Sequence, residues 1–137
     1  MASAKWYYEK IDLYRGFKYF VALNTEEGYR CGYVEIDEDY PLYDVHYSEI
    51  DCIESVDLTF SGNVKEFGGY YIGWGHDVSN EGVDLNAIAK HHPEDANKYI
   101  DRVRGFKDVS AKFATLDDVE KECFEVINEL IRRYGQY

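Results

Sequence analysis

The segment from residue 31 to residue 64 contains no lysine and no arginine, although it carries nine carboxylates. The whole chain has 15 basic and 27 acidic residues and a formal net charge of −12, so this one segment holds three quarters of the net charge. Such a concentration repels nucleic acid and attracts cations or basic protein surfaces. We therefore expect no direct binding to duplex nucleic acid.

Cysteine is also scarce and is spaced for neither metal nor disulfide chemistry. The three cysteines are Cys31, Cys52 and Cys123, an odd number without a Cys-x-x-Cys pair. This spacing argues against a zinc ribbon and against a disulfide framework. The chain also lacks a signal peptide and an apolar run of membrane length, so we expect a cytoplasmic protein with free thiols and no membrane partner.

Several sequence signatures of catalysis are missing. The chain has no Gly-x-Ser-x-Gly elbow, no phosphate-binding loop and no calcium loop with EF-hand spacing. We therefore expect no cofactor and name no catalytic residue.

Tyrosine, in contrast, is abundant: 14 of the 137 residues are Tyr, beside seven Phe and two Trp. Tyrosine favours strands, and it also favours interfaces, because its ring is apolar and its hydroxyl needs a partner. A chain of this length and hydrophobic content is expected to fold as a single domain, residues 1–137, with a packed core.

The apolar pattern predicts four strands and two main helices. Aromatic and β-branched residues begin at Trp6 and break at Arg15-Gly16, and strands are predicted at 17–23, 29–36, 53–61 and 70–74. Asp84 is a candidate cap for a short helical turn, and Pro93 opens a helix near 93–104. Thr115 and Asp118 form a capping box for a final helix that Gly135 ends. The prediction is an α+β fold: an antiparallel sheet of four to five strands packed by a C-terminal helix near 115–134 and a shorter preceding helix.

Residues 37–51 lose this periodicity and are predicted to form a long loop. Acidic side chains are interleaved there with aromatic and aliphatic ones, as in a surface that docks onto a basic partner. The ordinary alternative is a solvated charged face. The candidate partner-binding residues are Glu35, Asp37, Glu38, Asp39, Tyr40, Leu42, Tyr43, Asp44 and Tyr47.

Two alternative sites use other parts of the chain. Tyr99, Arg102 and Arg104 are candidates for holding a small phosphate-bearing ligand, with the ring stacking on a base. His76 and Asp77 are candidates for a divalent cation that would activate a water molecule, although proper ligand spacing is missing.

Four short motifs stand out between residues 29 and 80: Gly32-Tyr33-Val34, Tyr40-Pro41-Leu42-Tyr43, Leu58-Thr59-Phe60-Ser61-Gly62 and Tyr71-Ile72-Gly73-Trp74. With these motifs and a charged closing helix, the chain resembles a widespread family of small, uncharacterised phage and prophage proteins. The chain departs from the family at Tyr40, where a His is usual, and at Ser55-Val56-Asp57. The resemblance implies a viral origin and no particular activity.

Our leading hypothesis is a phage-encoded, non-enzymatic binding protein that docks its acidic, tyrosine-rich surface on a basic host protein, as an anti-defence or host-interference factor. The alternatives are a binder of a small nucleotide signal and a small cation-dependent hydrolase. Exposed tyrosines also leave a homodimer open.

Overall fold

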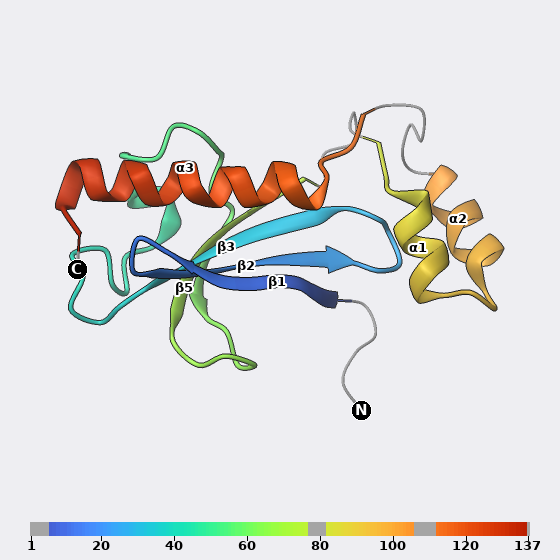
Figure 1. The fold of residues 1–137 in the computed structure, drawn as a ribbon, viewed down its shortest axis with the longest axis horizontal. Coiled ribbons are helices and arrows are strands. Elements are labelled where there is room, and N and C mark those ends of the chain that lie inside the picture. Colours follow the sequence, from blue (N-terminus) through green and yellow to red (C-terminus); the bar gives the residue numbers. More distant parts are fainter. Residues whose placement is uncertain (1–5, 77–81, 106–111, 137) are drawn as a thin grey trace.

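The computed structural model describes residues 6–76, 82–105 and 112–136. Five strands form one antiparallel sheet in the order β1-β2-β3-β5-β4, and three α-helices follow them in the chain (Figure 1). This confirms the α+β fold. The strands are β1 (Trp6–Tyr14), β2 (Phe17–Asn24), β3 (Arg30–Ile36), β4 (Phe60–Asn63) and β5 (Tyr70–Gly75); the helices are α1 (Leu85–His91), α2 (Ala96–Arg104) and α3 (Leu116–Tyr134).

The predicted elements are confirmed in kind, with two differences. Residues 53–59 were expected in a strand, but only Phe60–Asn63 pairs with β5. Ile53, Val56 and Leu58 instead pack against the core as irregular chain. The expected helix near 93–104 begins at Ala96, after a turn at 93–95.

The first hairpin adds β1 to the sheet as its fifth strand. Arg15 and Gly16 both have positive φ, 52° and 88°, as the tight turns that suit the twist of antiparallel strands require. The turn joins β1 to β2 and makes β1 one edge of the sheet.

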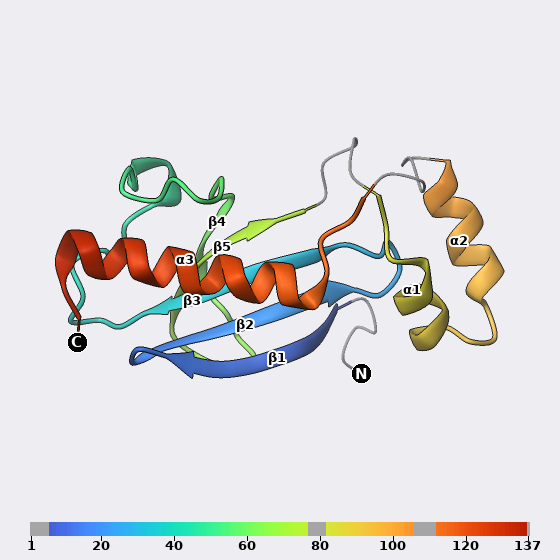
Figure 2. The ribbon, with the colours of Figure 1, turned by 45° about the horizontal axis from the view of Figure 1, so that its top comes forward.

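One face of the sheet is covered by α3 (Figures 1 and 2). Thr115 caps this helix as predicted: its side chain accepts from the Asp118 amide at 3.1 Å, and the Asp118 carboxylate accepts from the Thr115 amide at 3.0 Å. Its buried stripe packs on side chains from β2, β3 and β5. The stripe consists of Val119, Cys123, Val126, Ile127 and Leu130.

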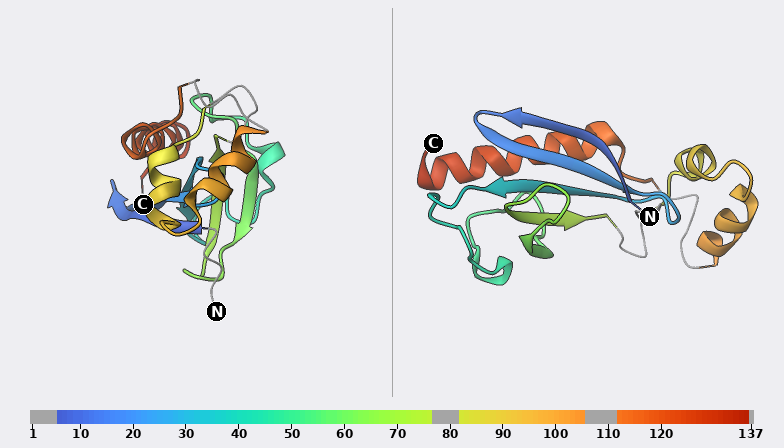
Figure 3. Two further views of the ribbon diagram at one scale, coloured as in Figure 1. Left: turned by 90° about the vertical axis from the view of Figure 1, so that its right-hand side faces the viewer. Right: turned by 90° about the horizontal axis from the view of Figure 1, so that it is seen from below.

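The opposite face carries an aromatic cluster instead of a helix. Seen from below, the sheet lies in front of α3 (Figure 3). Phe67, in the turn between β4 and β5, folds onto this face, with its ring centroid 4.9 Å from that of Tyr8 and 4.7 Å from that of Phe20. Several of the tyrosines are therefore accounted for by packing on a sheet.

Two glycines let large rings lie flat on the sheet. Gly32 pairs with Trp74 and Tyr33 pairs with Gly73 on neighbouring strands. A Cβ atom at Gly32 would lie 2.5 Å from the Trp74 ring, and one at Gly73 would lie 2.6 Å from the Tyr33 ring. Each ring thus occupies the space that the opposite residue leaves empty, one on each face.

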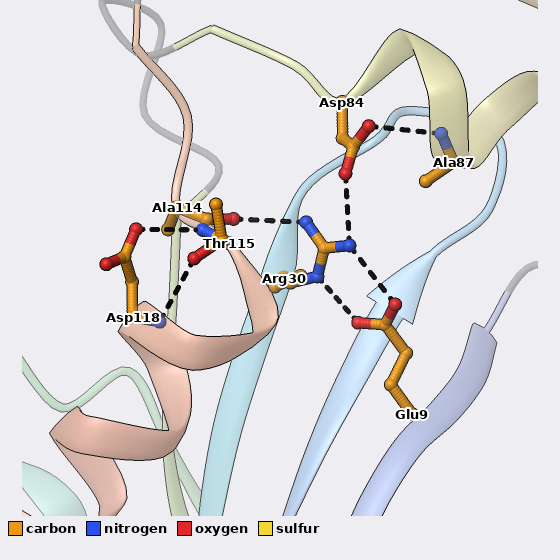
Figure 4. Close-up of polar contacts among 7 residues, drawn as sticks. All are labelled: Glu9, Arg30, Asp84, Ala87, Ala114, Thr115 and Asp118. Atoms are coloured by element: carbon orange, nitrogen blue, oxygen red, sulfur yellow. Dashed lines mark hydrogen bonds and ion pairs between the residues drawn. The ribbon is translucent and has the colours of Figure 1, made fainter.

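Arg30 joins the separate parts of the fold (Figure 4). Its side chain is buried and forms ion pairs with Glu9 of β1, at 2.6 Å, and with Asp84, at 3.0 Å. It also donates to the Ala114 carbonyl, 3.1 Å away, just before α3. Burial lowers the pKa of Arg30, but the bonds and charges of the two carboxylates outweigh burial and raise it above its usual value. The guanidinium therefore stays charged and holds four chain segments together.

The pair α1 and α2 lies at one end of the sheet (Figure 1). Asp84 caps α1 by accepting from the Ala87 amide at 3.1 Å, and its own amide donates to the Gly28 carbonyl at 2.9 Å. Val83 and Ile88 form a small core with side chains of α2. Among the helices of the described residues, none is long and apolar enough to cross a membrane.

Replacing Arg30 with Met should lower the free energy of unfolding by about 3–5 kcal/mol, because two carboxylates lose their buried countercharge. Chemical denaturation monitored by circular dichroism measures the change. The matched control is Arg102→Met, which removes a more exposed ion pair with Glu26 and should cost less than about 1 kcal/mol. Equal losses in the two variants would show that the Arg30 network adds nothing special to the fold.

Candidate functional site

The acidic segment between β3 and β4 is fixed to the rest of the fold by hydrogen bonds. The Tyr40 hydroxyl donates to the carbonyls of Leu130, at 3.0 Å, and Gly135, at 2.8 Å, at the C-terminal end of α3. The Tyr70 hydroxyl of β5 donates to the Val45 carbonyl at 2.6 Å. The long loop predicted at 37–51 is therefore a series of turns with one short 3-10 helix, Tyr47–Glu49.

A carboxylate of α3 fixes the second half of the segment. Glu129 accepts from the amides of Glu54, at 2.9 Å, and Ser55, at 3.3 Å. It also accepts from the Ser55 hydroxyl at 2.6 Å. Sequence reasoning missed Glu129, because its partners lie 74 and 75 residues away and no local pattern connects them.

The acidic side chains of this segment all point to solvent. We call these exposed carboxylates the acidic surface: Asp37, Glu38, Asp39, Asp44, Glu49, Asp51, Glu54 and Asp57. All but Asp37 form no ion pair with any other residue that the structure describes. The negative charge of the other seven side chains is therefore available to an external partner.

Glu35 lies beside this surface, on β3. It is half-buried and pairs with Tyr71 of β5. An open hollow of about 620 Å³ brings Glu35, Asp37 and Asp39 together with Lys18 and Tyr40. The structure thus places these three predicted carboxylates at one site.

The predicted hydrophobic anchors divide into two pairs. Tyr40 and Leu42 are 6% and 5% exposed and belong to the core, which corrects the expectation that they face a partner. The reason is the irregular path of the chain, which turns both side chains inward beneath α3. Tyr43, with 39% exposure, and the half-buried Tyr47 remain accessible.

An aromatic pair was missed in the sequence. The exposed His46 stacks on Tyr47 with ring centroids 4.4 Å apart, and its Nδ1 accepts from the Ser48 amide at 3.1 Å. His46 thus caps the short helix and fixes the Tyr47 ring. The signal in the sequence was only the adjacency of the two residues.

The candidate ligand residues of α2 already have partners within the chain. The Tyr99 ring lies 4.0 Å from the His92 ring and 5.3 Å from the Arg102 guanidinium, measured to the Tyr99 centroid. Arg102 also pairs with Glu26 at 3.0 Å. Arg104 is exposed at the end of the helix. A base stacking on Tyr99 would compete with these contacts.

The candidate metal residues are placed only in part. His76 contacts Glu122 at 2.7 Å, and the Trp74 indole donates to the same carboxylate oxygen at 2.9 Å. Asp77 lies outside the described residues. Within the described ranges, no group of three or more His, Cys, Asp or Glu side chains could hold a metal ion.

The cysteines are free thiols. Burial raises the pKa of Cys123, and it also raises that of Cys52. Both thiols therefore stay protonated near neutral pH, which disfavours a role as nucleophile.

Comparison of the chain with protein-family models, with curated proteins and with solved structures found no match.

Replacing Glu129 with Ala should release the turn at residues 54–55. We expect a loss of about 1–2 kcal/mol in unfolding free energy, because three hydrogen bonds to one carboxylate disappear. Hydrogen exchange at the amides of Glu54 and Ser55 should accelerate. The control is Glu125→Ala, an exposed position one turn earlier on α3, which removes the same charge; exchange that is equally fast in both variants would contradict the anchoring role.

Proposed function

We propose that this protein is a non-enzymatic binding protein that docks its acidic surface onto a basic partner protein. The observation that carries the proposal is the set of seven exposed carboxylates without ion pairs among the described residues, held on a segment that side chains from α3 and β5 fix in place. A merely solvated loop would not need such anchoring.

Electrostatics and rigidity both favour this role. A concentrated negative field accelerates encounter with a basic surface and rejects acidic competitors. Because the turns are already ordered, binding costs less conformational entropy than it would for a mobile acidic tail. Tyr43 and the stacked pair of His46 and Tyr47 supply rings beside the charges, and aromatic side chains often dominate binding energy.

The resemblance to small phage proteins extends the proposal to the identity of the partner. The partner would be a basic protein of the bacterial host, and docking would interfere with a host system such as an anti-phage defence. A host protein that normally binds nucleic acid offers the required basic surface, because it is shaped for phosphate charges.

The two other candidate functions have less support from the geometry. A nucleotide signal would have to displace the contacts of Tyr99 with His92 and Arg102. A hydrolase built on His76 would need a cluster of metal ligands. Among the described residues no group of three or more His, Cys, Asp or Glu side chains could hold a metal ion, and His76 contacts Glu122. Both stay alternatives to the docking function.

The test is a variant of the acidic surface with Glu38→Gln, Asp39→Asn and Glu49→Gln. Pull-down from a bacterial lysate should retain a basic protein on the wild type at low salt and release it at high salt. We expect the variant to bind that protein on the order of tenfold more weakly, because exposed charge pairs contribute about 0.2–1 kcal/mol each. Titration with the purified partner measures the dissociation constant at each salt concentration.

The matched control neutralises three exposed carboxylates elsewhere, with Glu94→Gln, Asp101→Asn and Asp117→Asn. Both variants lose three negative charges, so overall charge cannot explain a difference between them. The control should bind like the wild type. Equal affinity of the two variants for the captured protein, with the same salt dependence, would refute docking through the acidic surface.

A further inference from the structure

The edge strand β1 is open to a further strand. It forms one end of the sheet order, and no other described strand pairs with its outer side (Figure 2). It also carries exposed hydrophobic side chains: Tyr7 is 50%, Ile11 47% and Leu13 66% exposed. The opposite edge, β4, has only four residues. A long edge strand with exposed apolar side chains is a template for pairing with another chain.

The register of the first hairpin assigns the β1 side chains to the two faces. Ile11 pairs with Phe20 of the aromatic face, so it lies on that face with Leu13. Asp12 pairs with Tyr19 of the core under α3, and Lys10 lies on the same face, 3.7 Å from Asp12. From Lys10 to Leu13 the strand therefore alternates charged residues on the α3 face with apolar residues on the aromatic face.

We propose that a second copy of this chain pairs antiparallel with β1 about a two-fold axis at Ile11. Such an axis is perpendicular to the sheet and keeps each side chain on its own face. It places Lys10 opposite Asp12 of the partner subunit, and this attractive pair occurs twice. Ile11 lies opposite its own copy on the aromatic face.

The neighbouring registers are electrostatically unfavourable. An axis at Lys10 places two lysines opposite each other, and an axis at Asp12 places two aspartates opposite each other. Like charges in directly opposed positions destabilise a strand pair, and opposite charges stabilise it. The charge pattern of β1 therefore selects the register centred on Ile11. Because of the register shift between Tyr8 and Lys10, the regular part of this contact consists of residues 10–12 of each copy.

The dimer would keep the acidic surface free. Most of the segment 37–59 lies toward the β4 side of the sheet (Figure 2). Only its start comes near the β1–β2 turn, where Asp37 and Asp39 line a hollow with Gly16. Two copies joined at β1 form one continuous sheet with an acidic surface on each side of the axis. Such an arrangement presents two docking surfaces to one partner or to two, and bivalent binding raises the overall affinity.

Analytical ultracentrifugation tests the charge pairs. The wild type should sediment at twice the chain mass of 16.0 kDa. Lys10→Asp should raise the dimer dissociation constant on the order of tenfold or more, because two attractive pairs become repulsive. The swap Lys10→Asp with Asp12→Lys should restore it, since the opposite charges are again paired. A monomeric wild type, or a swap that stays as weak as Lys10→Asp, would overturn the proposal.

Disulfide cross-linking tests the position of the axis. In a Cys52→Ser background, Ile11→Cys should form an intermolecular disulfide on mild oxidation, because residue 11 faces its own copy. Asp12→Cys and Leu13→Cys should not, because the two copies of each residue are displaced along the strands. Circular dichroism confirms that each variant is folded. Cross-linking that is stronger at residue 12 or 13, or absent at residue 11 of a folded dimer, would overturn the register.

Discussion

The guanidinium of Arg30 is buried where β1, β3, the start of α1 and the start of α3 meet, and its charge has to be balanced there. Glu9 and Asp84 balance it, and the Ala114 carbonyl accepts one more of its hydrogen bonds. A buried cation is tolerated only with such partners, because desolvation is otherwise costly. The network therefore fixes the α1–α2 pair and the start of α3 relative to the sheet.

From that fixed start, α3 runs along one face of the sheet and supplies the attachment points of the acidic segment. The carbonyls of Leu130 and Gly135 accept hydrogen bonds from the Tyr40 hydroxyl, and the Glu129 carboxylate accepts from the turn at 54–55. The eight carboxylates of the acidic surface repel one another, so an unattached segment would expand. The ordered display of negative charge thus depends on contacts with the helix.

The fold uses its two sheet edges differently. The β4 edge is short and lies beside the acidic segment, whereas the β1 edge is long and carries Ile11 and Leu13 in solvent. A dimer at β1 and a basic partner at the acidic surface are compatible, because they use different parts of the molecule.

The sequence by itself determined the elements whose signals are local. The stripe and caps of α3 and the Asp84 cap follow from side chains within a few residues, and so does the concentration of charge. Only the tertiary structure decided which side chains of the acidic segment are buried. Tyr40 and Leu42 were expected at the surface, and residues 53–59 were expected in a strand. Residues of these types occur both in the predicted placement and in the observed one, so the sequence did not distinguish the two. Their burial beneath α3 and the partners of Arg30 depend on residues 21 to 95 positions away, and local periodicity carries no information over that range.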